Sequence, residues 1–239
     1  MSLKLSVIIP SYNEKDFVTK TIRKVVDINL ISRIEKEIIV VDDGSTDETY
    51  DALQSFTGLN QFPITIIRNP KNFGKGYSIK SALEKATGDI IIIQDADLEY
   101  DPSDYNKMLL PIVEGHADVV YGSRFTGNGP HRVLFFFHTI GNKFLTFLSN
   151  LFTGLNLTDM ETGYKMFRTE ILQQVKLREK RFGFEPEVTA KVSRIKNIRI
   201  YEVGISYYGR TYKDGKKINW VDGFRAMWCV IKYNIFFRK

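Results

Sequence analysis

The chain has 239 residues, 43% of them hydrophobic, which is enough apolar material for one domain with a sizeable core. Its formal net charge of +6 favours anionic partners, but the lack of a nucleic-acid-binding motif excludes nucleic acid as the expected one. The single cysteine, Cys229, excludes an intrachain disulfide and suits a reducing cytosol, and three histidines without metal-ligand spacing exclude a zinc site.

The N-terminal half alternates strand, polar loop and helix three times. Residues 5–10 predict the first strand, and residues 37–41 predict a second strand that ends in the acidic turn 42–47. A third predicted strand, residues 64–67, leads into the loop 69–76 and another helical pattern. This alternation predicts an α/β fold with a mostly parallel central sheet and helices on both of its faces.

A fourth strand is predicted at residues 90–93, where four isoleucines precede the segment Gln94-Asp-Ala-Asp97. Side chains alternate along an extended chain, so Asp95 and Asp97 can point the same way while Ala96 points aside. Two such carboxylates suit a hard divalent cation that also binds phosphate oxygens. An isolated Asp-x-Asp also occurs in ordinary turns, so the prediction depends on the other polar loops at the carboxyl edge of the same sheet.

Five segments in chain order resemble family 2 glycosyltransferases, and more narrowly the dolichol-phosphate mannose and glucose synthases and their bacterial polyprenyl-phosphate relatives. The segments are Ser6-Val-Ile-Ile-Pro-Ser-Tyr-Asn-Glu14, Val40-Val-Asp-Asp-Gly-Ser-Thr-Asp47, Asn72-Phe-Gly-Lys-Gly76, Gln94-Asp-Ala-Asp-Leu98 and Tyr121-Gly-Ser-Arg-Phe125. The resemblance extends from about residue 5 to about residue 225. It implies one Rossmann-like GT-A domain over residues 1–239, with a nucleotide-sugar and metal half at 1–128 and an acceptor half at 129–239.

The resemblance also implies a nucleotide-sugar donor, either a UDP-hexose or GDP-mannose, bound together with Mg²⁺ or Mn²⁺. The implied donor-binding residues are Pro10, Tyr12, Glu14, Asp43, Lys75, Asp95, Ala96, Asp97 and Lys217. Among them Asp43 would read the edge of the base. Asp95 and Asp97 would hold the metal, with Glu99 as a third ligand where relatives have glutamine. A bound cation offsets the charge that develops on a leaving nucleoside diphosphate.

Lys75 lies in a Gly-Lys-Gly loop before a helix, which has the flexibility and charge to approach a phosphate. The loop is not a Walker A motif, because the required glycine spacing and the following Ser or Thr are absent.

The second half is expected to bind the acceptor, with Asp97, Arg124 and Arg210 as the implied catalytic residues. Arg124 follows an apolar strand at 117–121, and Arg210 belongs to a basic segment, 207–217, that resembles the family's closing loop; Lys216 competes with Lys217 for the last phosphate contact. A phosphate monoester is ionised near neutral pH and needs cations more than a general base. We therefore expect inverting transfer to a polyprenyl phosphate, dolichyl or undecaprenyl.

Three alternatives remain at this point. Asp159, Glu185 or Glu187 could serve as a base for a hydroxyl acceptor on a lipid-linked or cell-wall glycan, or bind sugar hydroxyls instead. A nucleotidyltransferase shares the sheet and the metal chemistry but would release pyrophosphate. A binding module without catalysis is the least favoured, because both aspartates of Asp-Ala-Asp and the basic segment are intact.

Two segments of the second half have amphipathic helical patterns. Residues 133–155 place apolar side chains on one face and polar ones opposite, and residues 220–237 repeat this pattern. An aromatic-rich apolar face fits a helix in a membrane interface, and a helix packed on the domain's own core or in a homodimer fits the same pattern. Because residues 1–4 run directly into the first strand without a secretory signal, we expect a peripheral enzyme on the cytoplasmic face of the membrane.

Overall fold

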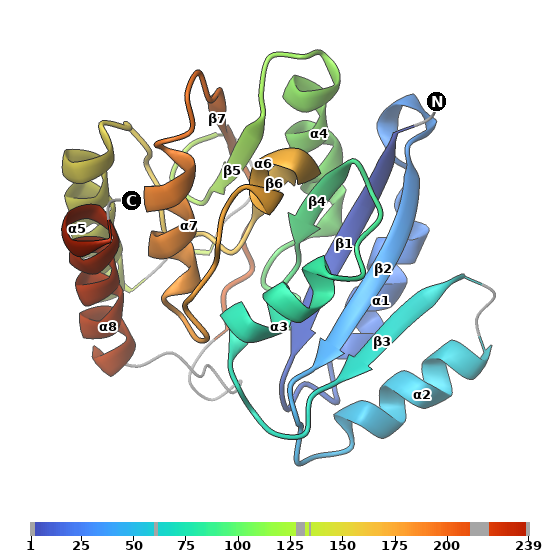
Figure 1. The fold of residues 1–239 in the computed structure, drawn as a ribbon. Coiled ribbons are helices and arrows are strands. Elements are labelled where there is room, and N and C mark those ends of the chain that lie inside the picture. The colour runs from blue at the N-terminus through green and yellow to red at the C-terminus, as the bar shows by residue number, and fades with distance from the viewer. Residues whose placement is uncertain (1–2, 60–61, 128–131, 134, 211–219, 238–239) are drawn as a thin grey trace.

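The computed structural model describes residues 3–59, 62–127, 132–133, 135–210 and 220–237, which form one central sheet covered by helices (Figure 1). The order of the seven strands across the sheet is β3-β2-β1-β4-β6-β5-β7. Their bounds are β1 (Lys4–Ser11), β2 (Glu35–Asp42), β3 (Ile64–Arg68), β4 (Ile90–Ile93), β5 (Val119–Ser123), β6 (Lys165–Arg168) and β7 (Ile200–Gly204). The four strands predicted for the N-terminal half correspond to β1 to β4.

The sheet is mostly parallel, as predicted, with β6 as the exception. β1 pairs in parallel with β2 and β4, and β5 pairs in parallel with β7. β6 lies between β4 and β5 and is antiparallel to both. The predicted donor half and acceptor half therefore share one hydrogen-bonded sheet, joined through β6.

Helices cover both faces of the sheet. Their bounds are α1 (Val18–Asp27), α2 (Thr49–Leu59), α3 (Lys75–Leu83), α4 (Tyr105–Val113), α5 (Phe136–Thr153), α6 (Thr169–Gln173), α7 (Phe184–Val192) and α8 (Trp220–Ile231), with short helical turns η1 (Ile31–Arg33), η2 (Pro102–Asp104) and η4 (Lys232–Phe236). Residues of α1, α2 and α4 share one apolar core with one face of the sheet, and residues of α3, α6, α7 and α8 share a second core with the other face.

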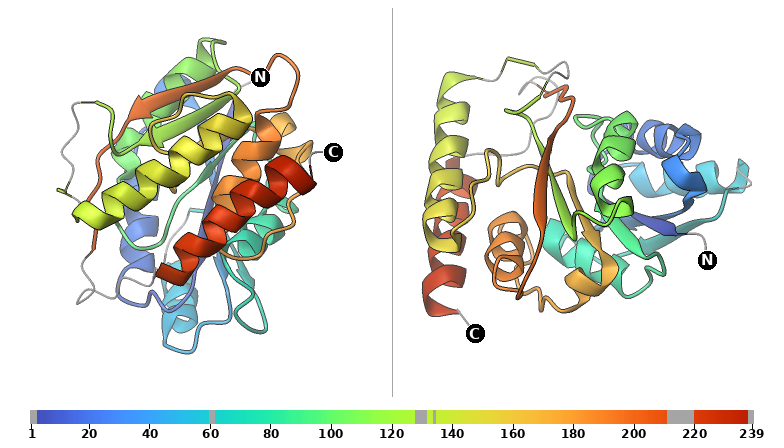
Figure 2. Two further views of the ribbon diagram at one scale, coloured as in Figure 1. Left: turned by 90° about the vertical axis from the view of Figure 1, so that its left-hand side faces the viewer. Right: turned by 90° about the horizontal axis from the view of Figure 1, so that it is seen from above.

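Alternation along the strands explains how both cores form. In β1, Val7 belongs to the first core and Ile8 to the second, and all four isoleucines of β4 are buried because both faces of that strand are covered. The amphipathic segments predicted at 133–155 and 220–237 correspond to α5 and to α8 with η4. Figure 2 shows α5 and α8 side by side in an outer layer, beyond α7 and away from the sheet.

Candidate active site

Three acidic side chains gather just after β4, at the carboxyl edge of the sheet. Asp95 and Asp97 follow the strand, and Asp97 Oδ1 accepts a hydrogen bond from the Glu99 backbone N–H at 3.1 Å. Leu98, between Asp97 and Glu99, has a φ of 62°, a left-handed conformation that costs energy for a branched apolar side chain. This tight turn brings Asp97 and Glu99 close together, and Asp95 lies near enough to Asp97 to act on it electrostatically.

Two basic side chains, Lys75 and Arg210, form ion pairs with these carboxylates. Lys75 Nζ lies 2.8 Å from Asp95 Oδ1 and 3.0 Å from Glu185 Oε1. Arg210 Nη2 lies 3.0 Å from Asp97 Oδ2, and its Nη1 lies 3.1 Å from Glu14 Oε2. Burial disfavours the charged form of Lys75, but the two carboxylates outweigh burial and raise its pKa. The structure therefore joins Lys75 and Arg210, both predicted to bind phosphate, to the predicted metal-binding segment.

Glu99 holds the described part of the basic segment 207–217 in place. Glu99 Oε2 accepts a hydrogen bond from Tyr207 Oη at 2.8 Å, and Glu99 Oε1 accepts one from the Arg210 backbone N–H at 2.7 Å. The Glu99 carbonyl also accepts a hydrogen bond from the Tyr208 backbone N–H at 2.8 Å. Lys216 and Lys217, the candidates for the last phosphate contact, lie outside the described residues.

The donor set fits a hard divalent cation by its chemistry. Burial, followed by repulsion from Asp95 and Glu99, raises the pKa of Asp97 to about 7, although Arg210 opposes this shift. Carboxylate oxygens with surplus negative charge are what Mg²⁺ and Mn²⁺ prefer. Within the described part of the chain, however, no three acidic, histidine or cysteine side chains form a preformed metal cage. Lys75 and Arg210 take carboxylate oxygens that a metal would need.

Asp43 has a different environment from the one expected for a residue that reads a base. It is buried, and its Oδ1 accepts hydrogen bonds from Asn69 Nδ2 at 2.6 Å and from the Phe73 backbone N–H at 3.2 Å. Its Oδ2 accepts one from the Gly74 backbone N–H at 2.6 Å. Asp43 therefore fixes the loop that precedes Lys75, and its role as a base reader stays a prediction.

Gly74 shows why this loop needs glycine. Its φ is 103°, and an added Cβ would collide with the Lys180 carbonyl and the Arg181 side chain. The glycine lets the loop pass close to residues 180–181 and turn into α3, whose first residue is Lys75.

The remaining predicted donor residues lie on the same edge. Pro10 is in β1, Tyr12 follows that strand, and Ala96 is buried between the two aspartates. The turn after β2 is tied to this segment, because Asn13 Oδ1 accepts a hydrogen bond from the Thr46 backbone N–H at 2.8 Å. The segments that resemble a nucleotide-sugar site are therefore neighbours in space, although their individual contacts to a donor stay predictions.

The site has two poles. The carboxylates after β4, with Lys75 and Arg210, form the first, and the ion pair of Arg124 with Asp159 forms the second, the arginine pole. Arg124 Nε and Nη2 each donate to a different oxygen of Asp159 at 2.7 Å, and Asp159 is fully buried. Burial alone would raise the pKa of Asp159, but Arg124 outweighs it and holds that pKa below its ordinary value. Glu202, on β7, accepts hydrogen bonds from the backbone N–H groups of Thr158 and Asp159 and so positions the pair.

The three acids considered as candidate bases therefore have different neighbours. Asp159 is paired with Arg124, and Glu185 is paired with Lys75. Glu187 is fully buried and accepts hydrogen bonds from the backbone N–H groups of Arg178 and Glu179, away from the carboxylate cluster. Only Glu185 is joined to the metal-binding segment, through Lys75.

Two features were not found from the sequence. Arg132 is exposed, and it donates hydrogen bonds to the Tyr207 carbonyl at 2.9 Å from its backbone N–H and to the Gly209 carbonyl at 2.6 Å from its Nη1. It therefore lies beside the segment that carries Arg210. No spacing in the sequence connects residue 132 with residue 209, so only the charge of Arg132 could have drawn attention to it.

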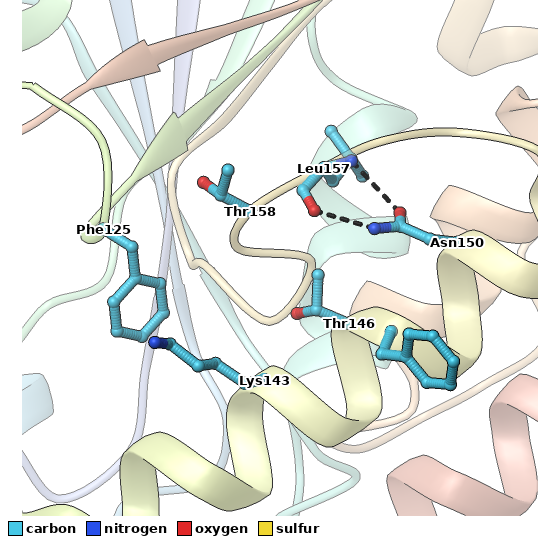
Figure 3. A pocket seen from close by; sticks show the side chains of 7 residues that line it. Phe125, Lys143, Thr146, Asn150, Leu157 and Thr158 are labelled. Carbon is cyan, nitrogen blue, oxygen red and sulfur yellow. Dashed lines mark hydrogen bonds between the residues drawn. The ribbon is translucent and has the colours of Figure 1, made fainter.

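The second feature is a cavity of about 370 Å³ between α5 and the end of β5 (Figure 3). The Lys143 side chain extends toward the Phe125 ring, and Thr146 and Thr158 line the wall. Because Phe125 follows Arg124 and Thr158 precedes Asp159, the cavity adjoins the arginine pole of the site.

The outer faces of α5 and α8 carry exposed apolar side chains. Those at least 48% exposed are Phe136, Phe137, Ile140, Phe144, Phe147 and Leu151 on α5 and Phe224 and Trp228 on α8. Both helices lie in the outer layer seen in Figure 2. No helix among the described residues is both long and apolar enough to cross a lipid bilayer.

Comparisons with known proteins agree with this arrangement. Residues 6–176 match the sequence profile described as Glycosyl transferase family 2. The chain is 28% identical over 88% of its length to dodecaprenyl-phosphate galacturonate synthase of Rhizobium johnstonii, and it spans 61% of that relative. It is 29% identical to UDP-N-acetylglucosamine–dolichyl-phosphate N-acetylglucosaminyltransferase of Methanococcus voltae, with 94% of each chain covered.

The fold is shared with glucosyl-3-phosphoglycerate synthase of Mycobacterium tuberculosis, solved in complex with Mn²⁺, UDP and glucosyl-3-phosphoglycerate. The TM-score is 0.71 at 17% identity, with 97% of this chain and 80% of the other covered. The expected GT-A architecture is therefore confirmed.

Proposed function

The chain belongs to glycosyl transferase family 2, and from this premise we propose that it transfers a hexose from a nucleotide sugar to the phosphate of a polyprenyl phosphate. Both relatives named above are described as acting with a polyprenyl phosphate, dodecaprenyl or dolichyl. The donor is a UDP-hexose or GDP-mannose, and the reaction needs Mg²⁺ or Mn²⁺.

The observation that carries this proposal is the bidentate pair between Arg124 and Asp159. A hydroxyl acceptor needs a base within hydrogen-bond reach, and Asp159 is occupied by Arg124. A phosphate acceptor is already ionised and needs a cation to position it. The guanidinium of Arg124, oriented by Asp159, supplies positive charge for a phosphate, and the exposed Arg132 adds a second guanidinium near the Arg210 segment.

The carboxylates after β4, with Lys75 and Arg210, are the donor pole in this proposal. There Asp95, Asp97 and Glu99 would hold the divalent cation. When bound, that cation supplies Lewis-acid stabilisation of the charge on the departing nucleoside diphosphate. Lys75 and Arg210 supply further positive charge at the same pole, where each bridges two carboxylates. Pro10, Tyr12 and Glu14 would contact the nucleoside.

The transfer itself is a direct displacement in this proposal. An oxygen of the acceptor phosphate attacks the anomeric carbon, and the bond from that carbon to the diphosphate oxygen breaks. The configuration inverts, so an α-linked donor gives a β-linked product. The chain's own residues orient the two phosphates and offset their charge, and no proton needs to leave the acceptor.

The outer layer supports a membrane-bound acceptor. Large exposed apolar patches mark interaction sites, and an aromatic-rich face on two adjacent helices suits the interface of a bilayer. We propose that α5 and α8 rest on the cytoplasmic face of the membrane and that the cavity between α5 and β5 receives the first part of the lipid chain.

A transfer assay with a donor panel tests the proposal. Labelled UDP-glucose, UDP-N-acetylglucosamine and GDP-mannose are each incubated with the protein, Mg²⁺ or Mn²⁺, and a short polyprenyl phosphate in vesicles. We expect one donor to give a glycosylated lipid phosphate and a nucleoside diphosphate, both abolished by EDTA. Release of pyrophosphate would identify a nucleotidyltransferase instead, and transfer that persists in EDTA would contradict the metal role.

A further inference from the structure

Glu179 is a buried carboxylate outside the two poles of the site. It belongs to the segment 178–181, which lies in the connection from α6 to α7 (Figure 1). The sequence of this segment is Arg-Glu-Lys-Arg, and its three basic residues are exposed while Glu179 is buried. An ionised carboxyl group is buried only when it has partners, so Glu179 is expected to hold this segment against another part of the fold.

The side chain of Glu179 binds α8 and the turn η4 that continues it. Glu179 Oε1 accepts hydrogen bonds from Lys232 Nζ at 2.7 Å and from Tyr233 Oη at 2.8 Å. Arg225 Nη2 lies 3.4 Å from the other carboxylate oxygen. Burial disfavours the charged form of Glu179, but hydrogen bonds from Lys232 and Tyr233 outweigh burial and hold its pKa below the ordinary value. Glu179 is therefore an ionised anchor between the segment 178–181 and α8.

The backbone of the same segment contacts the start of α3. The Lys180 carbonyl accepts a hydrogen bond from the Tyr77 backbone N–H at 3.0 Å. An added Cβ at Gly76 would lie 2.4 Å from the Glu179 carbonyl oxygen, so α3 begins in direct contact with this segment. Lys75 is one residue before Gly76, and its backbone is therefore positioned by the segment 178–181.

The helix α7 supports both ends of this arrangement. Glu187 accepts hydrogen bonds from the backbone N–H groups of Arg178 and Glu179. Glu185, on the same helix, lies 3.0 Å from Lys75 Nζ. α7 therefore holds the segment and the lysine head group, and α8 is joined to them through the Glu179 carboxylate. A helix of the outer layer is thereby connected to the donor pole.

Lys75 can offset the charge of a donor diphosphate only from a defined position, because hydrogen bonds and charge interactions weaken with distance. Building on the proposed function, we propose that Glu179 is a positioning residue for donor binding. Its ion pairs with α8 and η4 hold the segment 178–181, and this segment holds Lys75 within reach of the diphosphate. The helix proposed to rest on the bilayer and the lysine proposed to bind the donor then form one connected unit.

The experiment measures the Kd of UDP and GDP by titration calorimetry with Mg²⁺ and without vesicles, so that acceptor and membrane binding do not enter. Glu179→Gln keeps the shape of the side chain and removes its charge. Lys232→Met removes one partner of Glu179, and Lys75→Gln removes the proposed phosphate contact. Glu37→Gln is the matched control, because Glu37 is also a mostly buried carboxylate that binds a lysine and two hydroxyl groups, at the opposite edge of the sheet.

We expect Glu179→Gln to weaken binding of the preferred nucleotide about tenfold, because a small displacement of a contact residue is costly. Lys232→Met should weaken it about three- to tenfold for the same reason. Lys75→Gln should weaken it about 10- to 100-fold, as for loss of a hydrogen bond to a charged group. The double variant Glu179→Gln, Lys75→Gln should bind within about twofold of Lys75→Gln, because Glu179 acts through Lys75.

The control separates this role from a loss of stability. Glu179→Gln and Glu37→Gln should each lower the Tm by about 2–4 °C, but Glu37→Gln should leave nucleotide binding unchanged. Equal weakening in both variants would assign the effect to stability and overturn the proposal.

Two other results would also overturn the positioning role. The first is unchanged nucleotide binding in Glu179→Gln, and the second is a further tenfold loss, on the order of the single-variant effect, when Glu179→Gln is added to Lys75→Gln. A wild type that binds neither UDP nor GDP would overturn the proposed function together with this inference. Transfer to a hydroxyl acceptor alone would contradict the proposed acceptor, while nucleotide binding would still decide the role of Glu179.

Discussion

The carboxyl edge of the sheet and the outer layer formed by α5 and α8 are built in opposite ways. At the sheet edge nearly every charged side chain has a partner within the chain, as Lys75 has in Asp95 and Glu185. On the outer layer, Phe137 is 83% exposed and Phe147 is 64% exposed. In the proposed function, the first region binds small anionic ligands that replace internal ion pairs, and the second exposes an apolar surface of the kind that marks interaction sites.

The sheet edge itself contains two kinds of cation. Lys75 and Arg210 each bridge acids from different parts of the chain, whereas Arg124 is held by the single buried Asp159. A bridging cation can exchange one partner for a phosphate and keep the other. Arg124 is oriented by a partner that stays in place, which suits a fixed position for the acceptor.

Replacement of Arg124 should give the largest effect. Arg124→Met leaves Asp159 buried and unpaired, which is expected to cost about 3–5 kcal/mol of unfolding free energy and to abolish transfer. The double variant Arg124→Met, Asp159→Leu should recover most of this stability in urea unfolding, because neither charge of the pair is left buried without its partner. Transfer should stay absent in the double variant, and its return would show that Arg124 serves the fold alone.

Removal of a metal ligand should give the next largest effect. Asp95→Asn is expected to lower kcat/KM by about 10²- to 10³-fold, since stabilisation of the leaving diphosphate contributes several kcal/mol. Kinetics over a range of Mg²⁺ concentrations measure this loss. Asp51→Asn, an exposed aspartate on α2, is the matched control. Full activity of Asp95→Asn at low Mg²⁺ would remove Asp95 from the metal site.

A charged residue introduced on the outer layer should weaken membrane binding and leave the transfer reaction in solution unchanged. Phe137→Glu is expected to weaken binding to vesicles containing anionic lipid by about 10- to 30-fold, as for the loss of one buried aromatic side chain. Leu110→Glu is the control, because Leu110 is 48% exposed on α4, a helix on the opposite face of the sheet. Equal losses in both variants would argue against a specific membrane face, and a shift from dimer to monomer in Phe137→Glu would indicate a subunit interface instead.

The opposite edge of the sheet offers a purely structural carboxylate, and its effect should be the smallest. Burial disfavours ionisation of Glu37, but hydrogen bonds from Lys4, Ser6 and Thr87 outweigh it and lower its pKa to about 2. The resulting stabilisation is complete above the ordinary glutamate pKa of about 4.3 and is lost as the pH falls through that value toward 2.

Glu37→Gln should therefore be less stable than the wild type by about 1 kcal/mol at pH 7, allowing for screening by solvent, and this difference should vanish near pH 2. Urea unfolding at both pH values measures the difference, and transfer activity at pH 7 should be unchanged. A loss of transfer without a loss of stability would mean that the two edges of the sheet are not functionally distinct.

Much of the donor pole could be predicted because its signals are local. Four isoleucines predict β4, and the aspartates that follow are adjacent in sequence. The same holds for the amphipathic pattern of α5, whose period is visible in one segment. Short-range periodicity and turn chemistry were sufficient for these features.

The rest depends on contacts between distant residues. β6 has only four residues, and nothing in its sequence indicates an antiparallel position between β4 and β5. Arg210 pairs with Glu14 across almost the whole chain, and Asp43 accepts hydrogen bonds from a loop about thirty residues away. Pairings of this kind are set by tertiary packing and leave no periodic pattern in the sequence.

The most direct test of the central claim compares two acceptors, one with a phosphate and one without. With the preferred nucleotide sugar and Mg²⁺, initial transfer rates are measured for a short polyprenyl phosphate and for the matching polyprenol in the same vesicles. Because the Arg124–Asp159 pair provides a cation and no free base, transfer should occur to the phosphate and not to the alcohol. Transfer to the alcohol at a comparable rate would contradict the account and assign the site to hydroxyl acceptors.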